Sequence, residues 1–211
     1  MMKKITALLA SGFFFLSISS ANADYNFGFS LIAGETDTSG HELENGATGD
    51  KNTKDIQEVF MGGSIFAEFV ADNGFTFGID YVPLDVELGD GKRTDPSGTT
   101  GRDSGTRTAS ADLKDLITYY INVPFGANGF YGSFGYHTVD VTTTETLPTA
   151  SYGDASIDGF QYGLGYKSGQ LRYELFYSDF DDVSLTATGG KGSHKVEADA
   201  DALGLKIGYA F

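Results

Sequence analysis

The stretch from Phe160 to Ser178, FQYGLGYKSGQLRYELFYS, alternates bulky apolar residues with small, polar or charged ones on both sides of Ser168-Gly169. Successive side chains of a strand point to opposite faces, so this alternation predicts two strands, each with one bulky apolar face. Ser-Gly between two such runs is typical of a tight hairpin turn. The stretch therefore predicts an antiparallel β-hairpin.

The same alternation recurs along most of the chain after residue 23. It is regular in three further segments and looser in three others. Together with the hairpin these make eight predicted strands, and we expect no α-helix of consequence. The six additional strands are Tyr25–Leu31, Val59–Val70, Phe75–Val82, Leu113–Val123, Phe130–Val141 and Ala202–Phe211.

The connections between these strands alternate between short and long. Three are short and rich in Gly, as hairpin turns require, and four are long and polar. This alternation places all the turns at one end of an up-and-down sheet and all the long loops at the other. The short connections are 72–74, 126–129 and 168–169, and the long ones are 35–58, 86–112, 142–157 and 182–195.

The first 23 residues have the three parts of a secretory signal peptide. Lys3 and Lys4 precede an apolar run from Ile5 to Ile18, and Ala21-Asn22-Ala23 fits the small-residue cleavage rule. The apolar run is short for a membrane anchor, the alternative interpretation. We therefore expect cleavage before Asp24, with residues 24–211 forming one barrel domain.

Composition excludes several classes of protein. The chain has no Cys, and its net charge is −15, which opposes binding to nucleic acid because phosphate contacts need Lys and Arg. Its mean hydropathy of −0.17 argues against a bundle of transmembrane helices. The 29 Gly, 17 Phe and 12 Tyr residues suit β-structure instead.

Eight alternating strands fit either a soluble barrel or a membrane barrel. The bulky Phe, Tyr, Leu and Ile face has more volume than an eight-stranded interior can hold, whereas the Gly, Ser and Thr face fits a narrow, filled lumen. In lipid, every backbone N–H and C=O group needs a hydrogen-bond partner, and a closed barrel provides these partners because it has no unpaired edge strand. The pattern predicts an all-β, eight-stranded antiparallel up-and-down transmembrane β-barrel with three short periplasmic turns and four long extracellular loops.

The last strand ends in Tyr209-Ala210-Phe211, after alternating Leu203, Leu205 and Ile207. With this terminal aromatic residue, nearly the whole of 24–211 resembles the eight-stranded outer-membrane β-barrels of Gram-negative bacteria, the OmpA-like and OmpX-like group. The resemblance implies an outer-membrane location and recognition of the last strand by the barrel-assembly machinery. The residues to which it assigns this signal are Leu205, Ile207, Tyr209 and Phe211.

Several charged residues fall on the predicted lumen face. A charge in a small dry interior must be paired, so we expect a salt-bridge network that plugs the barrel. A narrow conduction path is the alternative, which an eight-stranded interior disfavours. The network residues are Glu68, Asp80, Lys167, Arg172, Glu174 and Lys206, with Thr118, Asn122, Tyr131 and Gln161 nearby.

Three histidines bear on whether the barrel is an enzyme, because a few related barrels modify lipid A. His41 and His194 lie in long loops, and His137 shares a predicted face with Ser133, near Thr138 and Asp140 in sequence. No G-x-S-x-G nucleophile elbow is present, so we expect a hydrogen-bonded lumen histidine and no catalysis. We also expect no cofactor and no bound metal.

The long loops carry most of the negative charge. Solvated, mutually repelling carboxylates are the first interpretation, and Ca²⁺ or Mg²⁺ shared with lipopolysaccharide is the second. Lys92, Arg93, Arg102 and Arg107 are candidates to meet lipid phosphates or a partner. The acidic positions include Glu35, Asp37, Glu42, Glu44, Asp50, Asp55, Asp181, Asp182, Glu197, Asp199 and Asp201.

Three functions remain open from the sequence. The first is a structural or surface-interaction role, in adhesion or envelope integrity, through the extracellular loops. The second is a narrow porin-like channel for small solutes, and the third is a lipid A-modifying enzyme. The expected partners are outer-membrane lipids, lipopolysaccharide and, during biogenesis, the assembly machinery. We expect a monomer, and the sequence names no extracellular ligand.

Overall fold

A computed structural model describes most of the chain after the predicted signal peptide, which lies outside the described residues. The described ranges are 24–44, 51–83, 86–95, 105–126, 128–146, 150–189 and 194–211. The strands are β1 (Asp24–Glu44), β2 (Lys51–Val70), β3 (Thr76–Val82), β4 (Val86–Asp95), β5 (Gly105–Pro124), β6 (Phe130–Thr146), β7 (Ala150–Ser151), β8 (Ala155–Ser168), β9 (Leu171–Thr186), β10 (Thr188–Gly189) and β11 (His194–Ala210).

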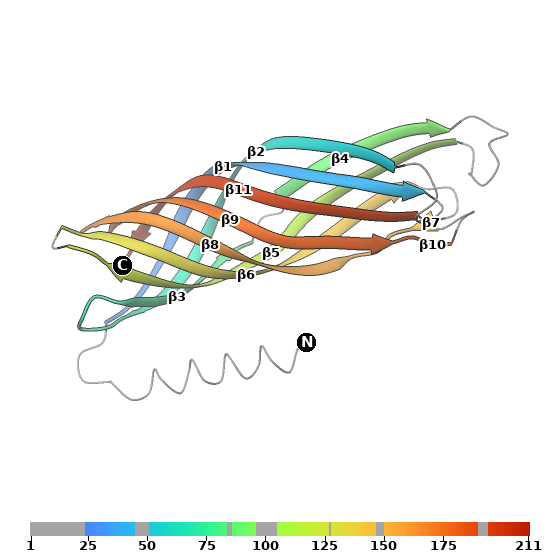
Figure 1. The fold of residues 1–211 in the computed structure, drawn as a ribbon. Coiled ribbons are helices and arrows are strands. Elements are labelled where there is room, and N and C mark those ends of the chain that lie inside the picture. Colours follow the sequence, from blue (N-terminus) through green and yellow to red (C-terminus); the bar gives the residue numbers. More distant parts are fainter. Residues whose placement is uncertain are drawn as a thin grey trace.

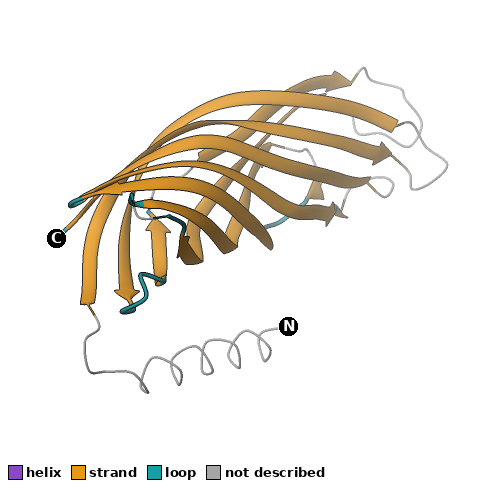
Figure 2. Cartoon of the chain, turned by 60° about the vertical axis from the view of Figure 1, so that its left-hand side comes forward, coloured by secondary structure: helices purple, strands orange, loops and turns teal. Residues whose placement is uncertain are grey.

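The long strands form one closed antiparallel barrel (Figures 1 and 2). The order around the barrel is β3-β2-β1-β11-β9-β8-β6-β5, and β5 pairs with β3 to close the ring. β4 continues the line of β3 along β5, so these two segments occupy one of eight positions in the wall of the described barrel. The predicted eight-stranded up-and-down barrel is confirmed.

The interruption between β3 and β4 has a local cause. Pro83 directly follows β3 and lacks the N–H that a strand position needs. Opposite the break, Asp115 of β5 adopts a φ of 52°, and the β5–β6 register shifts between Lys114 and Ile117. The Tyr81 hydroxyl donates to the Asp115 carboxylate at 2.6 Å, which ties the end of β3 to the irregular part of β5.

The three predicted short turns lie together at one end of the barrel, near the C-terminus (Figure 1). Ala71 N–H donates to the Phe75 carbonyl across the first, where Gly74 has a φ of 82°. Phe125 N–H donates to the Phe130 carbonyl across the second, of which residue 127 lies outside the described part. The third joins β8 directly to β9 through residues 169 and 170.

The prediction of four long loops is wrong for most of their length. The β1–β2 ladder continues to Leu43↔Lys51, the β4–β5 ladder runs from Val86↔Leu113 to Asp95↔Gly105, and β6 extends to Thr146. These segments are polar, and polarity suggested loops. Outside lipid, however, a ladder needs no apolar face, and Thr-rich cross-strand pairs are good strand formers. The barrel wall therefore extends well beyond its apolar part.

The apolar part is a belt on the outer surface. On β1 it runs from Tyr25 to Ala33, and above it the outward positions become Glu35, Asp37 and Ser39. Eleven residues of β1, 34–44, lie above the belt, about 36 Å of strand at about 3.3 Å per residue. Belt residues with large exposed side chains include Phe27, Phe29, Leu31, Val59, Met61, Ile65, Phe77, Phe134, Phe160, Tyr162, Leu164, Leu175, Leu203, Leu205 and Ile207.

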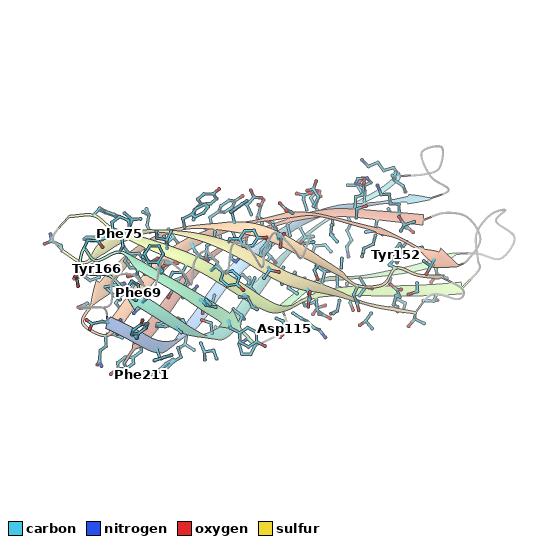
Figure 3. The ribbon with its side chains drawn as sticks, turned by 90° about the horizontal axis from the view of Figure 1, so that it is seen from below. Phe69, Phe75, Asp115, Tyr152, Tyr166 and Phe211 are labelled. Carbon is cyan, nitrogen blue, oxygen red and sulfur yellow. The ribbon has the colours of Figure 1, made fainter. Side chains whose placement is uncertain are left out.

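Aromatic residues concentrate at the turn end of this belt, where Figure 3 labels Phe69, Phe75, Tyr166 and Phe211. Tyr25 packs edge-on against Phe69 with ring centroids 5.6 Å apart, and Phe130 lies 4.9 Å from Tyr166. Such girdles mark the interface of a membrane barrel with water. In the described part of the chain, no helix is long and apolar enough to cross a membrane.

Candidate functional site

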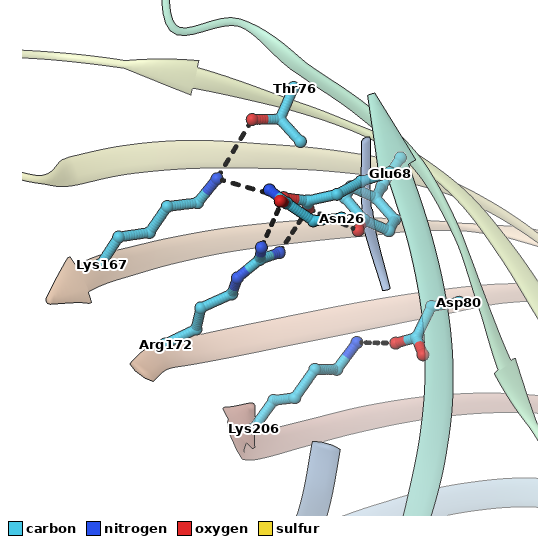
Figure 4. Close-up of polar contacts among 8 residues, drawn as sticks. Asn26, Glu68, Thr76, Asp80, Lys167, Arg172 and Lys206 are labelled. Atoms are coloured by element: carbon cyan, nitrogen blue, oxygen red, sulfur yellow. Dashed lines mark hydrogen bonds and ion pairs between the residues drawn. The ribbon is translucent and has the colours of Figure 1, made fainter. Parts of the chain in front are cut away.

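The lumen holds a network of charged side chains centred on Glu68 (Figure 4). Glu68 points inward from β2, and its side chain is fully buried. Both terminal nitrogens of Arg172 donate to its two carboxylate oxygens, a paired geometry that only a guanidinium provides. The Asn26 amide donates to Glu68 at 3.1 Å and the Tyr120 hydroxyl at 3.0 Å. One carboxylate therefore joins three other strands to β2.

The remaining network residues extend from this centre. Lys167 Nζ lies 3.9 Å from the Glu68 carboxylate and donates to the Thr76 hydroxyl at 3.1 Å. Lys206 Nζ donates to Asp80 Oδ2 at 2.5 Å, which links β11 to β3 across the lumen. Buried charges need such partners, since an unpaired one costs several kcal/mol.

Glu174 occupies a separate position in the lumen. Its buried carboxylate accepts a hydrogen bond from the Tyr131 hydroxyl. The six predicted network residues are thus three acids and three bases inside one barrel, and five of them form two ion-paired groups. Their charges balance in the described lumen.

Lumen aromatic rings lie against glycines of the neighbouring strand. A Cβ added at Gly165 would stand 2.1 Å from the Tyr131 ring, and one at Gly78 would stand 2.3 Å from the Tyr120 ring. Phe66 and Phe176 cover Gly28 and Gly204 in the same way. Glycine provides the space that a bulky ring needs beside a strand. The alternation in the sequence already places these four aromatic residues on the lumen face, but it does not show which glycine each ring covers.

His137 lies just beyond the charged network and is almost fully buried. Its Nδ1 is 2.8 Å from the Thr118 hydroxyl and its Nε2 is 2.9 Å from the Ser178 hydroxyl. Phe180 stacks on the ring with centroids 5.3 Å apart. Both ring nitrogens are therefore occupied. Ser133, which shares the inward face, is not among these partners, and Asp140 instead accepts from Ser156 on the outside.

An apolar plug fills the lumen beyond His137. We define the plug as the buried cluster Leu113, Val139, Val141, Ile157, Phe180, Ala200 and Ala202, with Phe60, Ala111, Leu116 and Val183 packed against it. Sequence reasoning predicted polar lumen residues and missed the plug. A signal was present, because Val139 and Val141 continue the inward alternation of His137.

The mouth of the barrel at the end opposite the short turns is bridged by the residues that follow β6. β7 and β10 pair as a separate two-stranded sheet. Tyr152 N–H donates to Glu145 of β6, and the Tyr152 hydroxyl donates to Glu42 of β1 at 3.1 Å. β1 lies four positions away from β6 in the ring of strands. The residues that follow β6 therefore lie across the opening that the strands surround.

The predicted loop residues fall mostly on the outer surface of the extended strands. Asp37, Asp55, Asp199 and Asp201 line a shared hollow on β1, β2 and β11. In the described residues, no three His, Asp or Glu side chains converge to hold a metal ion.

Two other groups of loop residues were singled out in the sequence. His41 Nε2 lies 3.0 Å from Glu197, and a hydrogen bond from Lys195 lowers the pKa of the Glu197 carboxyl. Lys92 is exposed on β4. Backbone positions 93 and 107 face each other across β4 and β5, whereas Asp50 and Arg102 lie outside the described residues.

The predicted assembly signal lies on the outer face of β11 and at the barrel seam. Leu205 and Ile207 are exposed in the belt, and the Tyr209 hydroxyl donates to Gln170 at 2.5 Å. Phe211 N–H donates to the Phe27 carbonyl at 2.9 Å, and Phe27 N–H donates back at 3.3 Å. The last residue therefore closes the first strand onto the last. Its recognition by the assembly machinery stays a prediction.

Comparisons with known proteins agree with this architecture. No family model matches the chain, and no curated protein matches its sequence. Among solved structures, the outer membrane protein OprG from Pseudomonas aeruginosa matches with a TM-score of 0.53 at 12% identity, over 90% of this chain and 96% of that one.

Two further structures match less well. Neisserial surface protein A matches with a TM-score of 0.42 at 11% identity, over 90% of this chain and 99% of that one. The outer membrane protease OmpT from Escherichia coli matches with a TM-score of 0.47 at 11% identity, over 92% of this chain and all of that one. The fold assignment rests on the observed ring of strands and on the OprG match, which agree with each other. The chain therefore has the fold of a bacterial outer-membrane β-barrel, and its exposed apolar belt is typical of a barrel that spans a membrane.

Proposed function

We propose that the protein is a sealed integral outer-membrane barrel with a structural or surface-interaction role, exerted through the strands that extend beyond the membrane. The observation that carries this proposal is the filled lumen. An ion-paired layer around Glu68 is followed by His137 and then by the apolar plug. Because these layers block the lumen one after another, we assign the barrel a role as a rigid scaffold.

The extended wall supports the interaction part of the proposal. The β1–β2 and β1–β11 ladders both continue about ten residues beyond the belt, so the extracellular part is hydrogen-bonded sheet along most of its height. A rigid sheet presents side chains at low entropic cost, which favours binding to a partner. Adhesion and envelope integrity are the roles that suit such a surface.

The alternative of a porin-like channel would need a continuous polar path. Val139 and Val141 are almost completely buried in the plug, and Phe180 lies beside them. An ion crossing this layer would lose its hydration without gaining a polar partner. We therefore rank the channel below the structural role.

Lipid A modification is the third candidate, and the surroundings of His137 do not favour it. Both ring nitrogens engage hydroxyls inside the barrel, and the ring is shielded from lipid by the wall. A catalytic base must reach the proton that it abstracts. We propose a structural role for this histidine.

Photo-crosslinking on intact cells tests the proposed surface role. A photoreactive amino acid is placed at Ser39 or Thr53, which are exposed above the belt, and at Leu31 in the belt as the matched control. We expect discrete adducts with envelope or extracellular macromolecules from the two upper sites, and lipid adducts alone from Leu31. If the upper sites give no adduct in cells that display the folded protein, the surface role is wrong.

A further inference from the structure

A seam interrupts the barrel wall beyond Pro83, on the side away from the turns. β2 pairs with β3 only from Ile65 to Val70, and β4 pairs with β5 alone. β4 lies beside the upper part of β2 (Figure 1), but in the described residues no ladder joins these two strands. Residues 51–64 of β2 are therefore paired on one side only, with β1. The wall here has two free strand edges that face each other.

The hydrogen bonds of the neighbouring ladder show which backbone groups of β2 lie on the free edge. Ala71 N–H donates to the Phe75 carbonyl, toward β3. In an antiparallel strand every second residue directs both its N–H and its C=O to the same neighbour, so the odd-numbered residues of β2 point toward β3 and β4. In the register of the ladder, Gly63 falls opposite Pro83, which has no N–H to donate. The ladder therefore ends at this point.

Five odd-numbered residues continue this edge beyond Gly63, with N–H and C=O groups that no strand of the described chain pairs. A side chain bridges the seam instead, since Lys54 Nζ donates to the Asp90 carbonyl. A ladder would place the two backbones about 5 Å apart and would need no such bridge. An unpaired edge is a template for pairing with another extended chain. The edge residues are Thr53, Asp55, Gln57, Val59 and Met61.

The side chains along this edge are open on the side of the seam. Val59 is 80% exposed and Met61 is 84% exposed, whereas Ile65, which has β3 beside it, is 58% exposed. The side chains of Lys54 and Glu58 are exposed too, although even-numbered residues of β2 point inward. The strand thus lacks a neighbour on one side along most of its upper half.

Backbone chemistry selects the class of partner for this edge. Alternating donors and acceptors in a straight row are matched by an extended polypeptide, whereas a lipid offers no such row. Asp55 belongs to the acidic hollow described above, and opposite charges on paired strands attract each other. Closer to the turns, Val59 and Met61 offer an apolar surface. The edge therefore fits a segment with a basic residue opposite Asp55 and apolar residues opposite the other two.

We propose that the free edge of β2 is a docking site for an extended segment of another protein, which adds to the sheet as a strand. Backbone hydrogen bonds to the odd-numbered residues 53–61 supply the affinity, and the side chains opposite Asp55, Val59 and Met61 supply the preference. The Lys54 bridge to Asp90 opens when the strand binds. This inference rests on the surface role proposed above and names the place on that surface where the partner binds.

Amide hydrogen exchange tests the edge residue by residue, by NMR on the refolded ¹⁵N-labelled protein in detergent micelles. The odd-numbered amides at 53–57 face the seam, and the even-numbered amides at 54–58 face β1. The probe is a synthetic nine-residue peptide, rich in Thr, with Lys opposite Asp55 and Val opposite Val59 and Met61. The control peptide is N-methylated along its length, so it keeps the side chains and loses the N–H donors.

Without peptide, we expect the odd-numbered amides to exchange at least about tenfold faster than the even-numbered ones. With the probe peptide, we expect the odd-numbered amides to be slowed at least about tenfold and the even-numbered ones to stay unchanged. Asp55→Asn is expected to weaken peptide binding by up to about fivefold. Asp199→Asn, on β11 and two strands away from the edge, is the matched control and should bind like wild type.

Three results would overturn the docking edge. Odd-numbered amides that are already protected without peptide would show that the seam is paired. Equal binding of the N-methylated peptide would show attraction by side chains alone, and this control decides even if Asp55→Asn does not fold. Protection that grows with barrel concentration would assign the edge to a second copy.

The docking edge and the surface role fail separately. Crosslinked adducts from Ser39 on β1, without peptide-induced protection on β2, would keep the surface role and overturn the docking edge. Protection by the peptide, without adducts from Ser39 or Thr53 on intact cells, would overturn the surface role and, with it, the assignment of the edge to a partner in the cell.

Discussion

Replacing either partner of the Glu68–Arg172 pair is expected to destabilise the barrel strongly. The carboxylate is fully buried and the guanidinium is 12% exposed, with the Phe66 ring 4.6 Å below it. In Glu68→Met, Arg172 loses both of its paired hydrogen bonds, and Asn26 and Tyr120 lose an acceptor. Breaking one side of a buried pair costs about 3–5 kcal/mol. We expect this loss for Glu68→Met and for Arg172→Met.

The double variant separates pairing from packing. Removing both charges leaves neither member of the pair buried alone. Lys167 loses its ion pair in Glu68→Met and in the double variant alike, but it is partly exposed and keeps its hydrogen bond to Thr76. We therefore expect Glu68→Met/Arg172→Met to be no less stable than Glu68→Met. The coupling free energy is then at least about 3 kcal/mol. Urea unfolding of the refolded barrel measures the stability of all four proteins in the cycle. Far-UV circular dichroism follows the unfolding, because the chain has no Trp to report it by fluorescence.

An exposed pair supplies the control for this cycle. Lys195 and Glu197 also form an ion pair, but both side chains are more than a third exposed. Solvent screens such pairs, and we expect their cycle to show no resolvable coupling. Additive effects at Glu68 and Arg172, or single variants with near-wild-type stability, would refute the reasoning that the lumen network holds the strands together.

Four other substitutions test three separate parts of the structure. Phe180→Ala leaves a cavity in the plug, and we expect a loss of about 3–5 kcal/mol in the free energy of unfolding by urea titration. Gly165→Ala places a methyl group against the Tyr131 ring and is expected to cost about 1–3 kcal/mol. Gly132→Ala, with nothing within 4 Å, should stay within about 1 kcal/mol of wild type, and equal effects would contradict the ring-on-glycine packing. Phe211→Ala is expected to lower the folded amount in outer-membrane fractions severalfold while leaving refolding in detergent unchanged, and unchanged cellular amounts would contradict the assembly signal.

The outer face of the barrel and its turns could be predicted from local pattern. Alternation along Phe160–Ser178 fixes which side chains share a face, and Gly in short connections marks the turns. Both follow from backbone geometry over a few residues. The charged residues of the lumen were predictable for the same reason, since a lumen position is any position between two belt positions.

Contacts across the ring could not be predicted in this way. The pairing of Glu68 with Arg172 spans 104 residues, and its geometry depends on the register of every strand between them. Likewise, the rings of Tyr131 and Phe176 reach glycines only because the ladders align them. The lengths of the strands were mispredicted for another reason. Where a strand lies in water its residues are polar, so its composition is the same as that of a loop.

The central claim is that the lumen is sealed, and conductance across a planar lipid bilayer tests it most directly. Pure, refolded protein is inserted at known density, and the current is recorded in monovalent salt. We expect no discrete current steps, because the Glu68 layer and the plug block the path in series. Reproducible, uniform steps that scale with the amount of inserted protein would contradict the sealed barrel and favour the channel.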